Sequence, residues 1–161
     1  MRLTIDDSIL KLWPDCRLGY SIIAGVTIGE TPPALAEEFS CLQEEITQRY
    51  NLAELAAVPR IGAVRRMYKK LTFDPSRYRP ASEAMVRRIL QGKGLYCVNS
   101  AVDVNNYCSV KFLLPMGLYD LGRIHGDVRY LVAASGTYTN IAGNSVSTDG
   151  KPFLADELGV F

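Results

Sequence analysis

The sequence is poor in the residues that most often bind transition metals. It has one histidine, His125, and its four cysteines (Cys16, Cys41, Cys97 and Cys108) contain no C-x-x-C pair, the spacing typical of zinc sites. A chain of 161 residues also needs neither a metal nor a disulfide to fold. We therefore expect reduced, mostly buried thiols, no bound metal and no cofactor.

The sequence also lacks an apolar run of about 18 residues, so we expect no membrane-spanning helix. The N-terminal stretch MRLTIDDSILKLWPD carries acids where a signal peptide has its apolar core, which favours a cytoplasmic protein without a membrane partner. The length suits a single domain over residues 1–161. The final ADELGVF is apolar and strand-like, which favours a domain truncated at Phe161.

Charge is unevenly distributed, although the net charge is only +1. Residues 1–59 carry a net charge of −5, residues 60–93 of +8 and residues 94–161 of −2. A nearly neutral protein therefore contains one strongly basic segment, and such segments are typical of surfaces that bind polyanions.

Apolar periodicity predicts helices over residues 34–50, 61–71 and 80–91. In the first of these, acids separate the apolar residues that recur at helical spacing: Leu35, Phe39, Leu42, Ile46 and Tyr50. Pro80 suits the first turn of the third helix, and Gly92 and Gly94 suit its end. On that helix Arg79, Glu83 and Arg87 are spaced by four, which predicts a ladder of charges on the surface.

Strands are expected before and after the helices along the chain. β-Branched residues alternate with small ones over residues 18–28, and period-two patterns occupy DVRYLVAAS, TYTNIA and KPFLAD from Asp127 onward. We expect the later strands to be short and antiparallel. Helices followed by such strands indicate an α+β fold in which helices cover one face of the sheet.

In the segment NSAVDVNNYCSVKFLLPMGLYDL, residues 99–121, one acid and three amides interrupt the apolar run that ends at Pro115: Asp103, Asn99, Asn105 and Asn106. Buried without partners, such groups cost about 1–3 kcal/mol each, so they either fold the chain locally or face a ligand. Asp103 suits the first turn of a helix over residues 102–115, where free N–H groups attract a carboxylate. Asn105 and Asn106 are unfavourable inside a helix, so a local turn or a ligand must account for them.

Two further residues complete this candidate pocket. Asp120 precedes a glycine-containing turn. Its side chain either caps that turn or faces a ligand. Gly117 marks either a strained backbone position or a close approach of a ligand to the main chain.

His125 stands before a Gly-Asp turn, and we expect it to be exposed rather than catalytic.

The runs VDVNNY, LPMGLYDL and GDVRYLVA resemble the B3/B4 domain of the bacterial phenylalanyl-tRNA synthetase beta subunit. The segment RYRPASEAMVRRILQGKG is more similar to stand-alone proteins built around that domain. The resemblance implies an α+β fold arranged as a three-layer sandwich of two sheets and helices. It also implies a tRNA-related role, because in the synthetase this domain hydrolyses tyrosine wrongly attached to the phenylalanine tRNA. By position, Asp103, Asn106, Pro115 and Asp120 match the family pattern.

The sequence departs from the family at residues that matter for editing. Asn105 takes the place of a threonine that lines the editing pocket, and Gly117 falls where the synthetase has a pocket histidine. The family glutamate that recognises the tyrosine hydroxyl lies in a segment beyond the position of Phe161. The resemblance therefore does not imply tyrosine-specific editing, and nothing in the sequence resembles the catalytic domain of the synthetase.

The basic segment is a second candidate site. RRMYKK places bases around Tyr68, so phosphates could be bound with an aromatic ring nearby. The alternative is a pair of solvated helix faces, partly neutralised by the acidic helix at residues 35–54. The candidate RNA-binding residues are Arg65, Arg66, Lys69, Lys70, Arg87 and Arg88.

Two functions remain open on this basis, and both take tRNA or its aminoacylated 3′ end, or a small amino-acid-like ligand, as partner. A freestanding editing hydrolase could hold a water molecule with Asn105 and Asn106 and stabilise the oxyanion with backbone N–H groups. A non-catalytic binding module would keep the pocket for tRNA, an amino acid or another small metabolite. Gly117 favours the module, because glycine has no side chain that donates a proton.

Overall fold

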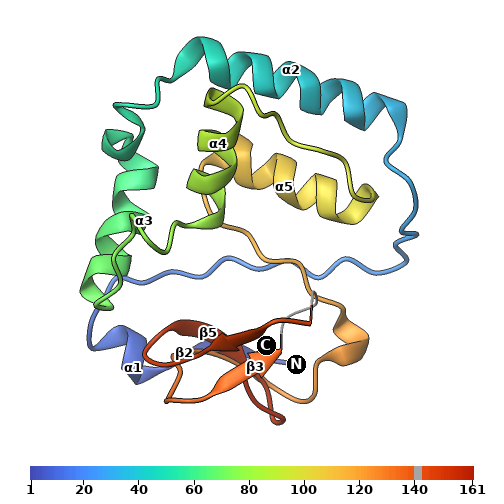
Figure 1. Cartoon of the computed structure of the whole chain (residues 1–161). Coiled ribbons are helices and arrows are strands. Elements are labelled where there is room, and N and C mark those ends of the chain that lie inside the picture. The colour runs from blue at the N-terminus through green and yellow to red at the C-terminus, as the bar shows by residue number, and fades with distance from the viewer. Residues whose placement is uncertain (140–142) are drawn as a thin grey trace. The chain divides into compact units, whose positions relative to one another are not determined.

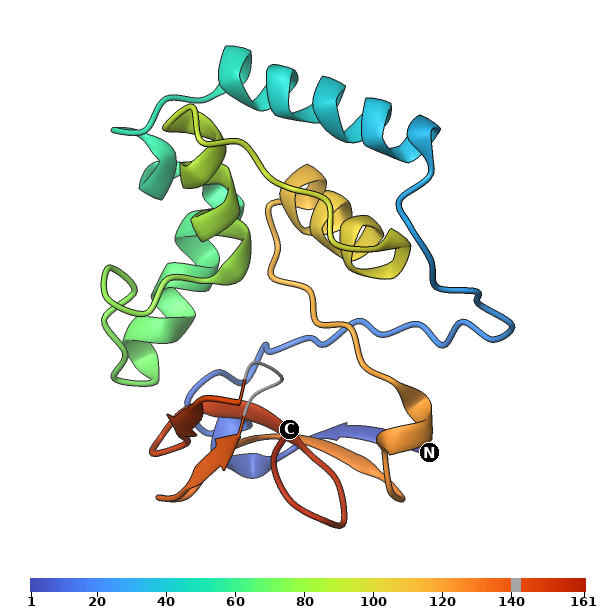
Figure 2. The same cartoon turned by 45° about the vertical axis from the view of Figure 1, so that its right-hand side comes forward.

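The computed structural model describes residues 1–139 and 143–161, which divide into two compact units (Figures 1 and 2). The strand unit comprises Met1–Ile22, Met67–Phe73 and Tyr119–Phe161. The helical unit comprises Ile23–Arg66 and Asp74–Leu118. The assignment of residues 1–161 to a single domain stays a prediction.

The helical unit is built from the helices that the periodicity predicts. In chain order they are α2 (Pro33–Arg49), the short η1 (Leu55–Ala57), α3 (Pro59–Lys70), α4 (Ala81–Leu90) and α5 (Ser100–Phe112). The last turn of α3 belongs by its contacts to the strand unit. The predicted helices are confirmed, with their ends shifted by a few residues.

The core of the helical unit forms where α2 packs against α4 and α5 (Figure 2). As predicted, the apolar stripe of α2 faces inward, with Phe39, Leu42 and Ile46 all buried. The other buried members of this core are Leu55, Ile61, Val86, Ile89, Val110 and Leu113. Burial of each large side chain contributes about 1.5–3 kcal/mol, so this cluster dominates the stability of the unit.

The ends of α5 are set by local chemistry. Asn99 is the N-cap, and its side chain accepts a hydrogen bond from the Val102 N–H at 2.9 Å. The helix therefore begins at Ser100, two residues before the predicted start. It ends where Leu113 adopts a left-handed conformation with φ of 55°, and the Leu114 N–H then bonds back to the Ser109 carbonyl.

The strand unit contains β1 (Leu3–Ile5), α1 (Asp7–Leu10), the short η2 (Leu121–Arg123), β2 (Val128–Val132), β3 (Thr137–Thr139), β4 (Ser145–Ser147) and β5 (Pro152–Ala155). One sheet has the order β1-β2-β5, and β3 pairs with β4 in another. Ile9, Cys16 and Leu71 form its buried core, with Trp13 and Tyr130 packed against them.

The strand predictions are confirmed in part. β2 and β5 fall within DVRYLVAAS and KPFLAD and pair antiparallel, and β3 occupies the start of TYTNIA. The last three residues of TYTNIA, 140–142, lie outside the described residues. The later strands pair antiparallel, as predicted, whereas β1, a strand that the sequence patterns did not predict, runs parallel to β2. The mixed α+β class is thus observed, whereas the three-layer sandwich stays a prediction.

The strand predicted over residues 18–28 is wrong. In the structure this segment is irregular and exposed; for example, Ile23 is 71% and Ile28 62% exposed. Gly25 has a φ of 69° and bends the chain, which interrupts the alternation of side chains. The composition favours a strand, but a strand also needs a partner, and none pairs with this segment in the described part of the chain.

The cysteines are free thiols, but they are less buried than predicted. Cys16 is buried and Cys108 half-buried, whereas Cys41 and Cys97 are exposed. Cys41 lies outside the apolar stripe of α2, and Cys97 lies in the loop before α5. Within residues 1–139 and 143–161, no helix is long and apolar enough to cross a membrane, and no group of three or more His, Cys, Asp or Glu residues is placed to hold a metal ion.

Candidate functional site

Asp103 is a fully buried carboxylate in the first turn of α5, the position that the sequence predicts. Its partners are outside the helix: it accepts hydrogen bonds from the Thr31 hydroxyl and from the Val98 N–H, the latter at 3.0 Å and 3.2 Å to its two oxygens. A buried charge needs such partners, and here one of them, Thr31, comes from a segment distant in sequence. Asp103 therefore joins the chain before α2 to the start of α5.

A second link supports the same junction. The Ser100 N–H donates to the Gly29 carbonyl at 2.9 Å, and the Gly29 N–H donates to the Ser100 hydroxyl at 3.2 Å. Together with Asp103, these bonds fasten residues 29–31 to the N-terminal end of α5. The polar residues at this point thus fold the chain, which was one of the two interpretations of the segment.

Asn105 and Asn106 are both half-buried, but they differ in their contacts. The Asn105 side-chain amide donates to the Met116 carbonyl at 3.2 Å and so holds the chain after α5 against the helix. For the Asn106 side chain, no hydrogen bond occurs among the described residues. Gly117 is exposed and is not one of the glycines with a positive φ, so backbone strain does not explain it.

Asp120 belongs to the strand unit, whereas the other four residues of the candidate pocket belong to the helical unit. It caps η2 by accepting a hydrogen bond from the Gly122 N–H at 2.9 Å. Arg123 lies 3.7 Å from its other oxygen, in an exposed pair that contributes little. The structure thus brings Asp103, Asn105, Asn106 and Gly117 into one unit, and the five-residue pocket stays a prediction.

A hollow of about 480 Å³, which no pattern in the sequence predicted, lies between α2 and α5. It is lined by Ala34, Glu37, Glu38, Cys41, Leu42, Glu45, Tyr107 and Lys111. Lys111 donates a hydrogen bond to the Tyr107 hydroxyl at 2.9 Å, which raises the pKa of the Lys111 ammonium. Three carboxylates face one cation here, so the hollow disfavours phosphate groups.

The charge ladder predicted on the surface of α4 is wrong, because Glu83 is fully buried. Its carboxylate accepts bonds from Arg65 Nη1, at 2.9 Å and 3.0 Å, and from Arg87 Nε at 2.9 Å. Arg65 comes from α3, 18 residues earlier. The four-residue spacing identified the Glu83–Arg87 pair, but it could not reveal the second arginine that makes burial of the acid possible.

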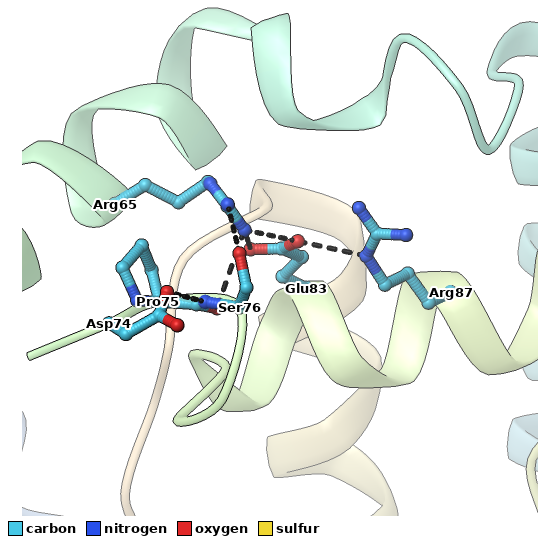
Figure 3. A network of polar contacts seen from close by, with 6 residues as sticks. All are labelled: Arg65, Asp74, Pro75, Ser76, Glu83 and Arg87. Carbon is cyan, nitrogen blue, oxygen red and sulfur yellow. Dashed lines mark hydrogen bonds and ion pairs between the residues drawn. The ribbon is translucent and has the colours of Figure 1, made fainter.

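The same network fixes the loop between α3 and α4 (Figure 3). Arg65 donates to the Pro75 carbonyl at 3.4 Å and to the Ser76 hydroxyl at 3.2 Å. The Ser76 N–H in turn donates to the Asp74 carboxylate at 2.8 Å. Arg65 and Arg87, two of the candidate RNA-binding residues, are thus engaged in an internal contact, with side chains only 16% and 22% exposed.

The remaining RNA-binding candidates are exposed: Arg66, Lys69 and Lys70 on α3 and Arg88 on α4. No carboxylate of the described residues forms a salt bridge with any of them. Tyr68, the aromatic residue among the α3 bases, is half-buried, and burial raises the pKa of its phenol. It therefore does not provide the open ring that the sequence suggested.

The comparisons with known proteins support the resemblance drawn from the motifs. Neither a search of curated proteins nor a search of solved structures found a significant match. A family model described as the B3/4 domain matches residues 63–159, which include α4, α5 and the VDVNNY and GDVRYLVA motifs. This match covers more than half of the 161 residues, so the chain belongs to the B3/4 domain family.

Proposed function

We propose that this B3/4 domain protein is a non-catalytic module that binds tRNA through the exposed bases of α3. The observation that carries the proposal is the spacing of Arg66, Lys69 and Lys70, which are three and four residues apart and so lie on one face of the helix. Each is exposed, and none forms a salt bridge with an acid in the described ranges. The Lys70 ammonium also lies 4.6 Å from the centre of the Trp13 ring, a contact that does not neutralise its charge. Three neighbouring cations without a carboxylate partner suit a phosphate backbone.

The arrangement of the amides supports binding rather than hydrolysis. Hydrolysis without a nucleophilic side chain requires groups that hold a water molecule beside the ester. Asn105 already binds the Met116 carbonyl, and Gly117 has no side chain to assist. Asn106 alone remains available, so the pair of amides that an editing site would use is incomplete. We further propose that the domain has the three-layer arrangement implied by the resemblance.

The tRNA-binding proposal predicts a strong dependence on salt. If the protein neutralises about four phosphates, the slope of log affinity against log salt should be near −3. Reversing the three charges with Arg66→Glu, Lys69→Glu and Lys70→Glu should weaken binding at least tenfold and bring the slope near −1, because about three of these contacts are lost. Titrations of unmodified tRNA at several salt concentrations measure both quantities.

The matched control reverses three exposed bases elsewhere: Arg17, Arg49 and Arg123. It changes the net charge by the same amount, so a general loss of attraction would affect both variants alike. The proposal requires the α3 variant to lose much more affinity than the control. Wild-type binding that is insensitive to salt, or equal losses in the two variants, would contradict it.

The proposal also predicts that the protein does not deacylate tRNA. Discrimination between tyrosine and phenylalanine is large only where a site hydrogen-bonds the tyrosine hydroxyl, and this chain has Gly117 at the position of the family histidine. Tyrosyl-tRNA and phenylalanyl-tRNA, offered separately at equal concentration, should each lose their amino acid no faster than in buffer. Rapid release selective for tyrosine would establish the editing hydrolase instead.

A further inference from the structure

An exposed aromatic ring, Tyr96, and two cations without a carboxylate partner, Arg88 and Lys93, lie at the C-terminal end of α4 and in the loop that follows it. Tyr96 is 70% exposed, more than any other aromatic side chain among the described residues. The Arg88 guanidinium carbon lies 5.6 Å from the centre of its ring, within the range of a cation–π contact. Lys93, in the intervening loop, is also exposed.

The loop that carries Tyr96 is held in a defined conformation. Gly92 and Gly94 have φ values of 71° and 59°, which allow the sharp turn after α4. Arg88 Nε donates to the Gly94 carbonyl at 2.7 Å, so the residue that covers the ring also fixes the loop. The next N–H, that of Leu95, donates to the Gln43 side chain of α2 at 2.7 Å. The peptide group between Gly94 and Leu95, one residue before Tyr96, is therefore held at both its carbonyl and its N–H.

Arg88, the charged residue that contacts the ring, is positive, and so is Lys93 in the same loop. Glu83, the acid of α4, is already bound by two arginines, and α2 contacts the loop through Gln43, which is uncharged. On α2, the acids Glu37, Glu38 and Glu45 line the hollow with Lys111. Neither Arg88 nor Lys93 forms a salt bridge within the part of the chain that the structure describes.

We infer that Tyr96 is a stacking platform for an unpaired base of single-stranded RNA, with Arg88 and Lys93 binding the flanking phosphates. Arg88 covers part of the ring, and the high exposure of Tyr96 leaves ring surface open to a planar base. Stacking of this kind tolerates any base, because every base has a flat π surface. The inference rests on the proposed tRNA binding and adds to it a site that selects unpaired nucleotides.

The test uses a single-stranded RNA of about eight adenosines containing one 2-aminopurine, whose fluorescence reports stacking. Tyr96→Ala should weaken binding about tenfold and abolish the fluorescence change, because one stacked base is lost. Tyr96→Phe keeps the ring and should bind as the wild type does. Tyr20→Ala is the matched control, since Tyr20 is also exposed, at 60%. Binding of an RNA duplex or of inorganic polyphosphate should not respond to Tyr96→Ala.

The outcomes separate the two proposals. The stacking site is overturned if the wild type and Tyr96→Ala bind the single strand with equal affinity. It is also overturned if Tyr96→Ala weakens polyphosphate binding as much as it weakens RNA binding. If the wild type binds the single strand through Tyr96 while the α3 charge reversal leaves tRNA binding unchanged, the stacking site stands and the α3 surface is wrong. Failure of the wild type to bind either RNA overturns both.

Discussion

Replacement of Glu83 by alanine should lower the free energy of unfolding by about 3 kcal/mol, since removal of one partner from a buried ion pair costs about 3–5 kcal/mol. The lower end applies because the Arg65 and Arg87 side chains are partly exposed and water can solvate them. Small domains are stable by only about 5–15 kcal/mol. One exchange on α4 should thus remove a large part of the stability.

The physical origin of this effect is the position of Glu83 between two helices and a loop. Its carboxylate binds Arg65 of α3 and Arg87 of α4, and Arg65 in turn holds the loop at Pro75 and Ser76. Without the carboxylate, two guanidinium groups of like charge remain close together with no acid between them. The loop also loses the residue that keeps Arg65 in place.

Urea unfolding of the wild type, Glu83→Ala and Glu83→Gln measures the effect. Glu83→Gln keeps the shape but removes the charge, so it should also destabilise the protein, though by less than alanine. The matched control is Glu44→Ala, an exposed glutamate of α2, which should change stability by no more than about 0.5 kcal/mol. The description of Glu83 as buried and paired would be wrong if Glu83→Ala cost no more than this control.

The helices were predictable because their signals are local. Phe39, Leu42 and Ile46 recur at the helical period and face the core, and Gly92 ends α4 as expected. The strands were less predictable, because pairing depends on distant residues. β1 has only three residues and is stabilised by its parallel partner β2, which begins at Val128. Residues 18–28 have the composition of a strand, but no strand of the described residues pairs with them.

The candidate site shows the same limit. The sequence singled out Asp103 and Asn105 as polar residues that need partners, and the structure supplies Thr31 and the Met116 carbonyl. Thr31 lies 72 residues before Asp103, so no spacing rule could have identified it. In the same way, the basic segment was evident, but the engagement of Arg65 with Glu83 was not.

Replacement of Asp103 by alanine should also lower the free energy of unfolding by about 3 kcal/mol. Hydrogen bonds to charged groups contribute about 1.5–3 kcal/mol, and the change leaves two former donors, the Thr31 hydroxyl and the Val98 N–H, without their acceptor. It also opens a small cavity at a site with no exposed surface. Glu44→Ala again serves as the control.

A double-mutant cycle separates the contribution of the Asp103–Thr31 hydrogen bond to stability from the cost of the cavity. Thr31→Val removes the hydroxyl, and if the two side chains interact as the structure shows, the losses in Asp103→Ala and Thr31→Val should not add. We expect a coupling energy of about 1–2 kcal/mol. Additive losses within about 0.3 kcal/mol would mean that the Thr31 contact does not stabilise the fold.

The same variants decide whether Asp103 folds the chain or binds a ligand. Because both of its oxygens are occupied and it has no exposed surface, tRNA affinity of Asp103→Asn should stay within about twofold of the wild type under conditions where it remains folded. Circular dichroism, recorded on the same samples as the tRNA titrations, verifies folding. A folded Asp103→Asn variant that loses tRNA binding would place the carboxylate in the binding site, and its match to the family pattern would then reflect ligand recognition rather than the junction with Thr31.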